Sequence, residues 1–513
     1  MRSTAIGRTA GALGVSLTVA FASLIPTMAT GHAAGGRAPA PRPIAAAAAF
    51  TNYEVSSVPG TVCPGAGAAC NNFASEPAIR ADRAGNLYAT SENGLGGGTE
   101  AWKSTDGGRH YTALSSPDAG STSNNSGFAP GGGDTDLATA PVKNAAGFHN
   151  VYVASLSLAN VDVSTSRDGG RTFALNPVGA LVPGDDREWI AADGASKVCV
   201  DYHDVATANI DLNCSFNAGL AFTQLGDVID ANHLWLINNN QIGNLMIDPV
   251  SHFVYATFSG IASQGELACG EAGSCGYHAV WMGVSKDGGK TFTDHPVYVN
   301  LDPKVSYGHQ FVNVSIDRGG NVYSIYSDDH NIDYSYSADH GRSWSAPVRV
   351  NSAPANTAIM PWSTAGAAGK LDVVYYGSGY YDGHSTPDNY PASAAWNVYF
   401  AQNLKATGGG GFSQVAASPI NHYGGVCESG VTCTGNRDLY DDFGVAASPI
   451  TGLASIVYSD DQYGTDPNSP PPPGCTTSTT NSSTCDHTEV ATQTAGAGIF
   501  GAPAGGGRHQ GRH

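Results

Sequence analysis

"SKDGGKTF", at residues 285–292, is one of five copies of an eight-residue phrase. The other four are "STDGGRHY" (104–111), "SRDGGRTF" (166–173), "SFNAGLAF" (215–222) and "SADHGRSW" (337–344). Gly adopts backbone conformations that other residues resist, and an Asp side chain accepts hydrogen bonds from backbone N–H groups of its own turn. The phrase therefore predicts a tight turn that recurs along the chain, and the turn itself catalyses nothing.

A second pattern precedes most copies of this phrase: an apolar strand that ends near an Asp, a turn, and another strand. Clear forms are "PAIRADRAGNLYATS" from Pro77 and "FVNVSIDRGGNVYSIYSDD" from Phe311. Alternating apolar residues that are β-branched or aromatic predict strands, and Gly, Asn, Pro and Asp predict the turns. With the weaker copies included, there are seven such units, which start at Pro77, Thr135, Glu188, Gly243, Phe311, Pro361 and Asp442.

Each unit adds one strand before the phrase and one after it. In the fifth unit these strands are "NIDYSYS" (331–337) and "SWSAPVRVN" (343–351). Four antiparallel strands repeated around an axis are the blades of a β-propeller. The sequence therefore predicts an all-β propeller with seven four-stranded antiparallel blades, and six blades is the alternative.

The seventh unit lacks both the phrase and a fourth strand after "TEVATQT" (488–494). The segment "AFTNYEVSSV" (49–58) has strand character but belongs to no unit. An open ring would leave a sheet edge exposed. We therefore expect residues 49–58 to supply the missing strand and close the ring.

The two ends of the chain have a different composition. Arg2 and Arg8 precede an apolar run and small residues near Ala33, which predicts a secretory signal peptide at 1–33. Residues 34–48 are rich in Ala and Pro and predict a disordered spacer, and 501–513 predict a disordered Gly/His tail. A single propeller domain is expected between them, at 49–500. These segments predict a secreted, extracellular protein, and we expect a monomer.

Charge and cysteines narrow the choice of partner. A net charge of −19 argues against nucleic acid and anionic membranes, which need clustered Lys and Arg, so we expect neither nucleic-acid binding nor membrane insertion. The ten cysteines are expected to form five local disulfides, typical of an exported chain. The expected pairs are Cys63–Cys70, Cys199–Cys214, Cys269–Cys275, Cys427–Cys433 and Cys475–Cys485.

The repeated phrase resembles the Asp-box, or BNR repeat, of sialidases and related propeller proteins, and the resemblance spans about residues 70–500. That group includes sialidases, other glycoside hydrolases, sorting receptors and assembly factors, so the resemblance implies the fold and not one activity. Familiar sialidases have six blades, whereas seven units are counted here. In such propellers the boxes lie on the face away from the active site. The resemblance therefore places a candidate site at the opposite face.

Polar clusters converge on that opposite face. Alignment of the repeats places Asp134, Arg187 and Asp442 at equivalent heights on three blades, on a rim expected to be solvated. Crowded carboxylates have pKa values that are pushed apart, as an acid and its partner base require, and exposed aromatic rings suit sugar faces. The candidate catalytic residues are Asp134, Asp136, Asp186, Arg187, Glu188, His203, Asp204, Tyr440, Asp441 and Asp442. The candidate substrate-binding residues are Trp189, Tyr202, His309, Asp329, His330, Trp362, Tyr376, Arg437 and Asp460.

The interpretation as a sialidase lacks support from one set of residues, the arginines that bind the substrate carboxylate. The family clamps the substrate carboxylate with three arginines, of which the first usually lies in an "F/Y-R-I-P" phrase that this chain lacks. Arg80 in "EPAIRAD" lies within a predicted strand, and only Arg187 and Arg437 fall on the expected site face. The resemblance would make Tyr440 the nucleophile and Glu188 its base, which only their location supports.

Two function classes therefore stay open. One is a secreted glycoside hydrolase of sialidase-like propeller type, which acts on an extracellular glycan or polysaccharide through acid and base carboxylates. The other is a non-catalytic propeller that binds glycan or protein on the same face. No cofactor is required by either class, and no residue is assigned to a metal. Ca²⁺ binding by the Asp clusters is the open alternative, because flexible loops offer several oxygen ligands.

Overall fold

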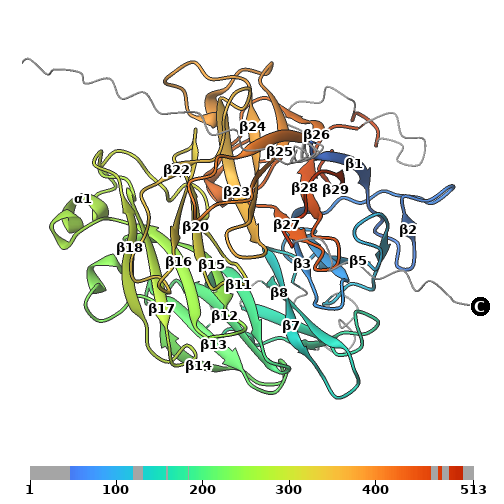
Figure 1. Cartoon of the computed structure of the whole chain (residues 1–513), viewed down its shortest axis with the longest axis horizontal. Helices are drawn as coiled ribbons and strands as arrows, with labels where there is room; N and C mark the ends of the chain where they lie inside the picture. Colours follow the sequence, from blue (N-terminus) through green and yellow to red (C-terminus); the bar gives the residue numbers. More distant parts are fainter. Residues whose placement is uncertain are drawn as a thin grey trace, which may run out of the picture. The chain divides into compact units, whose positions relative to one another are not determined.

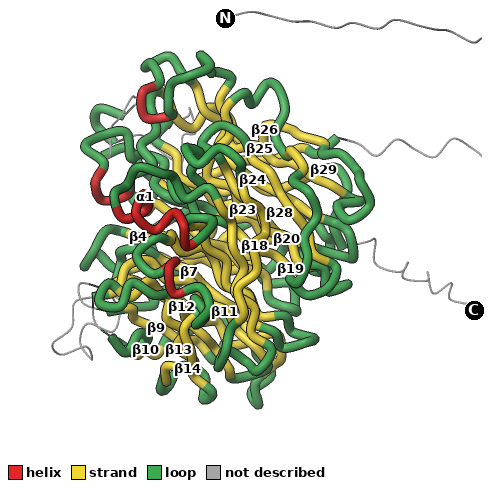
Figure 2. Tube along the Cα trace, turned by 90° about the vertical axis from the view of Figure 1, so that its left-hand side faces the viewer, coloured by secondary structure: helices red, strands yellow, loops and turns green. Residues whose placement is uncertain are grey.

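The computed structural model describes residues 47–118, 131–157, 160–182, 184–463, 472–475 and 484–500. The described chain is almost entirely strand and loop, with one short helix, α1 (Leu267–Glu271), and brief 3₁₀ segments gathered on one side (Figure 2). No helix among these residues is long and apolar enough to span a membrane. The expected signal peptide, most of the spacer and the expected tail lie outside the described residues.

Seven antiparallel sheets form the ring, which confirms the seven-bladed propeller and rules out six blades. The first strands of successive blades contact one another around the centre, and the last contacts the first. Blade one consists of β3 (Ser75–Ala81), β4 (Leu87–Glu92), β5 (Thr99–Ser104) and β6 (Tyr111–Ala113); blade two of β7 (Thr135–Lys143), β8 (His149–Leu156), β9 (Val161–Ser166) and β10 (Ala174–Asn176); and blade three of β11 (Asp185–Asp193), β12 (Lys197–Asp204), β13 (Ile210–Ser215) and β14 (Thr223–Asp227). Blade four consists of β15 (Asn240–Ile247), β16 (Val254–Gly260), β17 (Ala279–Ser285) and β18 (Thr293–Val299), and blade five of β19 (Asn313–Ile316), β20 (Val322–Ser327), β21 (Ile332–Ser337) and β22 (Val348–Arg349). Blade six consists of β23 (Thr357–Ala365), β24 (Leu371–Ser378), β25 (Ala395–Asn403) and β26 (Ser413–Tyr423), and blade seven of β27 (Gly444–Ala447), β28 (Ala454–Asp460), β29 (His487–Ala495) and β1 (Ala49–Glu54).

The N-terminal strand closes the ring as predicted. β1 pairs antiparallel with β29, with Tyr53 opposite Val490, and lies beside the C-terminal strands in Figure 1. Asn72 ties the same junction, since its side chain donates to the carbonyls of Val55 and Thr488 at 3.0 Å each. The first blade also has an unpredicted fifth strand, β2 (Val62–Cys63), which pairs with β6.

All five predicted disulfides are present. Cys199 of β12 lies directly opposite Cys214 of β13, so this bridge staples two neighbouring strands of the third blade. The apolar core lies between adjacent sheets; for example, Met282 and Val284 of blade four pack with Val314 and Tyr326 of blade five. Burial of such side chains is the main stabilising contribution to each blade interface.

The repeated phrases form the turns between the third and fourth strands of blades one to five. In the fourth blade, Asp287 accepts backbone hydrogen bonds from Lys290 at 3.1 Å and Thr291 at 3.0 Å. Ser285 Oγ accepts the Gly289 N–H at 2.8 Å and donates to Asp287 at 2.8 Å. Slight burial raises the pKa of Asp287, but the hydrogen bonds from Thr291, Ser285 and Lys290 prevail and lower it to about 2. The turns are structural, as expected.

The second glycine of each phrase also joins neighbouring blades. A Cβ on Gly289 would lie 2.5 Å from Leu212 of the preceding blade, and φ at Gly289 is +103°. The equivalent glycines, Gly108, Gly170, Gly219 and Gly341, each approach a side chain of the preceding blade in the same way. The first glycine has no such restriction, because Ala218 and His340 occupy its place at positive φ in two copies.

We therefore expect Gly289→Ala to destabilise the protein more than Gly288→Ala. Both changes place a Cβ at positive φ, which costs about 1–2 kcal/mol. Gly289→Ala adds overpacking against Leu212, worth about 1–3 kcal/mol more. Urea unfolding of the two variants measures the difference. Equal losses would show that the close approach between blades contributes nothing.

Candidate functional site

We call the face at which the first strands begin the mouth, and the opposite face, which carries the repeated phrases, the turn face. Three first strands have an irregularity near the mouth, and each contains a non-Gly residue at positive φ: Glu76 at 55°, Arg187 at 57° and Met360 at 51°. Such backbone conformations are costly and cluster at functional sites. They mark the mouth as the place to look for chemistry.

Arg187 binds three carboxylates from three different blades. Its guanidinium pairs with Glu76 of β3, with Asp134 just before β7 at 2.9 Å, and with Asp442 just before β27. The guanidinium also lies over the rings of Trp189 and Phe311, 4.4 and 4.3 Å from their centroids. The alignment of repeats correctly placed Asp134, Arg187 and Asp442 at one height. The fourth member of the cluster, Glu76, was missed, although it lies at the start of the first strand in "EPAIRAD".

The expectation of a solvated rim is wrong for this cluster. The Arg187 side chain is 5% exposed and that of Asp442 is 7% exposed, because the seven first strands converge and exclude water. Trp189 and Trp362 are also buried, with ring centroids 5.0 Å apart beneath Arg187. Tyr202 and Tyr376 are fully buried, so these four aromatic residues fill the centre and the blade interfaces instead of offering exposed sugar platforms.

A pocket of about 340 Å³ opens above this cluster. It brings together five of the predicted residues that carry charge, Asp134, Asp186, Arg187, Arg437 and Asp441, together with predicted His309. Arg437 pairs with Asp441 at 2.7 Å and lies over the Tyr440 ring. The remaining lining residues are Gln241, Gly308, Gln310, Phe311, Glu428, Ser429, Gly430 and Thr432.

One wall of the pocket is a chain of hydrogen bonds. His309 Nδ1 lies 2.6 Å from Asp329, and Gln310 donates from Nε2 to both Asp329 and Glu428. The Met360 N–H donates to the Gln310 side-chain oxygen at 2.6 Å, which fixes the orientation of the amide. Glu428 was missed from the sequence because it lies in the loop closed by Cys427 and Cys433, outside the repeats.

Burial governs the protonation of the mouth carboxyls. Burial, and then the charge of Asp329, raises the pKa of Glu428 well above its usual value. Burial and the charge of Asp134 raise the pKa of Glu92 to about 8, and burial raises that of Asp442 to about 7 against the attraction of Arg187. The mouth therefore holds carboxyl groups whose pKa is raised toward or above neutral pH beside carboxyl groups that pair with Arg187 and Arg437.

The other predicted residues lie outside the pocket. Asp136 pairs with Arg80 at 2.8 Å below Arg187, and Glu188 is buried. Asp204 shapes its own turn by accepting from Ala206 and Thr207. His203 and Asp460 lie at the mouth ends of β12 and β28. His330 lies in the loop after β20, where its Nε2 is 3.0 Å from the Ser385 carbonyl oxygen. Burial, and then the charge of Asp486, raises the pKa of Tyr440, whose ring lies beneath Arg437; neither carboxylate oxygen of Glu188 has a hydrogen-bond partner among the described residues.

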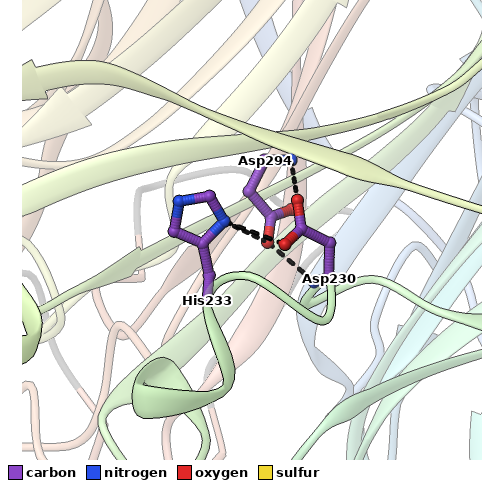
Figure 3. A group of neighbouring side chains, drawn as sticks. All are labelled: Asp230, His233 and Asp294. Atoms are coloured by element: carbon purple, nitrogen blue, oxygen red, sulfur yellow. Dashed lines mark hydrogen bonds and ion pairs between the residues drawn. The ribbon is translucent and has the colours of Figure 1, made fainter.

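Four groups of acidic and histidine side chains in the described residues are close enough to hold a metal ion. One is Glu76, Glu92 and Asp134 at the mouth, where Arg187 already supplies a cation to two of the three carboxylates. Another is Asp230, His233 and Asp294 (Figure 3). There each aspartate accepts a hydrogen bond from the other's backbone N–H, at 2.8 and 2.9 Å. These bonds connect the loop that precedes blade four to β18. The remaining groups are His422, Asp438 and Asp461, and Asp460, His487 and Glu489.

Comparison with known proteins gives similarity of structure only. No protein-family model matches the chain, and no curated protein matches it. An α-L-arabinanase of Penicillium chrysogenum is 12% identical and has a TM-score of 0.40, with 88% of this chain and 98% of that chain covered. A GH93 α-L-arabinofuranosidase of Fusarium graminearum is 16% identical with a TM-score of 0.40, over 64% and 92% of the two chains. A Hadza microbial sialidase is 12% identical with a TM-score of 0.38, over 84% and 68%. None of these likenesses bears on the activity of this chain.

We expect the protein to be most stable at mildly acidic pH. Carboxyls whose pKa is raised in the folded state bind a proton more tightly when folded, so their stabilisation is complete below about pH 4 and is lost as pH rises through the folded pKa. Raised values of about 8 for Glu92 and Asp294 and about 9 for Asp486 place that loss between pH 5 and 9. The melting temperature should therefore fall across this range.

Glu92→Gln should make the decrease of melting temperature between pH 5 and 9 less steep. Glu271→Gln, at an exposed position in α1, should leave the dependence of melting temperature on pH unchanged. A melting temperature that rises from pH 5 to 8 would contradict the buried-carboxyl account.

Replacement of Arg187 should cost stability because three buried carboxylates would lose their cation. Arg187→Met is expected to destabilise folding by about 3–5 kcal/mol, the usual range for breaking a buried ion pair from one side. Arg437→Met, with a side chain that is 30% exposed, is the matched control and should cost clearly less. Equal losses in urea unfolding would show that the Arg187 cluster is not a central support.

Proposed function

We propose that the protein is a secreted glycoside hydrolase whose reaction takes place in the mouth pocket. The observation that carries the proposal is that one pocket brings together a half-buried carboxyl whose pKa is raised well above its usual value, Glu428, and two further carboxylates, Asp186 and Asp441. Glycosidases use such a pair, one group as acid and the other as base or nucleophile. The five disulfides fit an exported protein.

In this proposal Glu428 donates its proton to the glycosidic oxygen as the bond to the leaving sugar breaks. Gln310 positions Glu428, because its amide is fixed by the Met360 N–H. The base or nucleophile is Asp186, which is exposed, or Asp441, which pairs with Arg437. His309 and Asp329 bind substrate hydroxyls from the same side as Glu428.

The charge of the pocket favours a neutral glycan over a sialoside. Arg187 is already paired with three carboxylates and Arg437 with a fourth, Asp441. A sugar carboxylate would have to displace one of these partners, at the cost of leaving a carboxylate unpaired. In this proposal the chain shares with sialidases the use of the mouth face for catalysis, but it lacks the arginine clamp that binds the carboxylate of sialic acid.

The test is hydrolysis of neutral aryl glycosides and neutral polysaccharides by the purified chain and by Glu428→Gln. On substrates with poor leaving groups, Glu428→Gln should lower kcat by about 10²–10⁴-fold, the usual contribution of a general acid. On dinitrophenyl glycosides, whose leaving group needs no proton, most activity should remain. Asp186→Asn or Asp441→Asn should abolish turnover of both kinds of substrate, which identifies the second carboxylate.

His330→Gln, on the same face but outside the pocket, is the matched control and should leave turnover intact. Saturable glycan binding without turnover, abolished by the same pocket variants, would instead show the non-catalytic binding propeller. Turnover that survives all three pocket variants would overturn the proposed site.

A further inference from the structure

The centre of the propeller has a second cavity, on the turn face. It has a volume of about 260 Å³ and is separated from the mouth pocket by the rings of Trp189 and Trp362, which contact each other at an interplanar angle of 36°. Trp362 and the side chain of Arg80, which lies 5.6 Å from the Trp362 centroid, line its inner end. At about 30 Å³ for each water in the liquid, the volume suits a small molecule or the end of a chain.

Three arginines line this cavity: Arg80 at the end of β3, Arg83 in the turn after it, and Arg318 in the turn after β19. Arg80 is paired with Asp136, which lies outside the lining. No hydrogen bond or ion pair of the Arg83 or Arg318 guanidinium is found among the described residues, and the Arg318 guanidinium lies 4.1 Å from the Phe500 centroid. Two exposed arginines thus line a cavity, and their guanidinium donors have no hydrogen-bond partner within the part of the chain that the structure describes.

The nearby acidic groups are already occupied by their own turns. Asp82, the one carboxylate of the lining, accepts the N–H groups of Ala84 and Asn86 at 2.9 Å each. Arg83 and Arg318 also line a neighbouring cavity of about 500 Å³ that includes Asp248 and Asp317. Those two carboxylates accept backbone N–H groups two residues further on, at 3.0 and 2.7 Å, so these oxygens are engaged by their own turns, and neither carboxylate forms an ion pair with Arg83 or Arg318 among the described residues.

We propose that this cavity binds a multivalent oxyanion, such as a phosphate or a carboxylate-bearing ligand, through Arg83 and Arg318. Guanidinium groups bind such anions with paired hydrogen bonds, and the Phe500 ring holds Arg318 in place. The chain as a whole carries a charge of −19, yet charges more than about 8 Å away are screened at physiological salt. The two guanidinium groups, with which no described carboxylate pairs, are therefore the groups that would bind the anion.

The test is titration calorimetry of the full chain with pyrophosphate, at constant ionic strength and with chloride as the reference anion. One saturable site is expected, weakened by about tenfold in Arg83→Gln and in Arg318→Gln, as for loss of a hydrogen bond to a charged group. Arg171→Gln is the matched control, since Arg171 also lies over a phenylalanine, Phe148, on the turn face but lines none of the described cavities.

A parallel titration with polygalacturonate tests whether the ligand is a free anion or an acidic polymer. If polygalacturonate binds more tightly than pyrophosphate, and if Arg83→Gln and Arg318→Gln both lose that binding, the site is assigned to a glycan chain. Absence of saturable pyrophosphate binding, or equal weakening by Arg171→Gln, would overturn the proposal. Melting temperatures of the variants within a degree or two of that of the parent protein would confirm that any loss of binding does not come from a loss of folding.

Discussion

The ion cluster around Arg187 is the contact on which the centre of this propeller depends. One guanidinium holds carboxylates from blades one, two and seven while it lies over aromatic rings from blades three and five. Removal of two opposite charges from water is expensive, and only several simultaneous partners of this kind offset the cost. The cluster therefore ties together blades that are far apart in the sequence, and it forms the floor on which the mouth pocket rests.

The two faces of the ring have separate tasks that follow from local chemistry. On the turn face, Ser and Asp side chains, with Asn217 in place of Asp in one copy, accept the backbone N–H groups of each repeated turn, and the second glycine brings the turn against the preceding blade. On the mouth, the same strands begin with irregular pairing, and longer loops bring Glu428 and Arg437 over the centre. Burial then keeps some carboxyls protonated beside others held by arginines. That combination makes acid–base chemistry available near neutral pH.

Much of the fold could be predicted because the sequence repeats itself. Seven copies of one strand–turn–strand pattern set the number of blades, and the missing strand after Thr494 pointed to closure by β1. Close spacing of the cysteines was enough to assign all five disulfides. The alignment also placed Asp134, Arg187 and Asp442 together, because equivalent positions in a ring of identical units lie at equivalent heights.

The predictions that were wrong or missing concern side chains whose environment depends on packing between blades. Whether Trp189, Trp362, Tyr202 and Tyr376 face solvent or a neighbouring blade is decided by side chains from other repeats, which a single strand pattern does not contain. Glu428 lies in a loop with no counterpart elsewhere in the chain, so no repeat could reveal it. The arginines of the turn face were likewise hidden, since Arg83 and Arg318 follow ordinary turn residues.

The most direct test of the account is a crystal structure of Glu428→Gln soaked with a neutral oligosaccharide that the parent protein cleaves. We expect the sugar in the mouth pocket, with the glycosidic oxygen within hydrogen-bonding distance of residue 428 and Asp186 or Asp441 on the opposite side of the ring. The Arg187 cluster should stay intact beneath it. A sugar bound elsewhere on the ring, or a metal ion in place of the Arg187 contacts, would contradict the assignment of the mouth as a catalytic site.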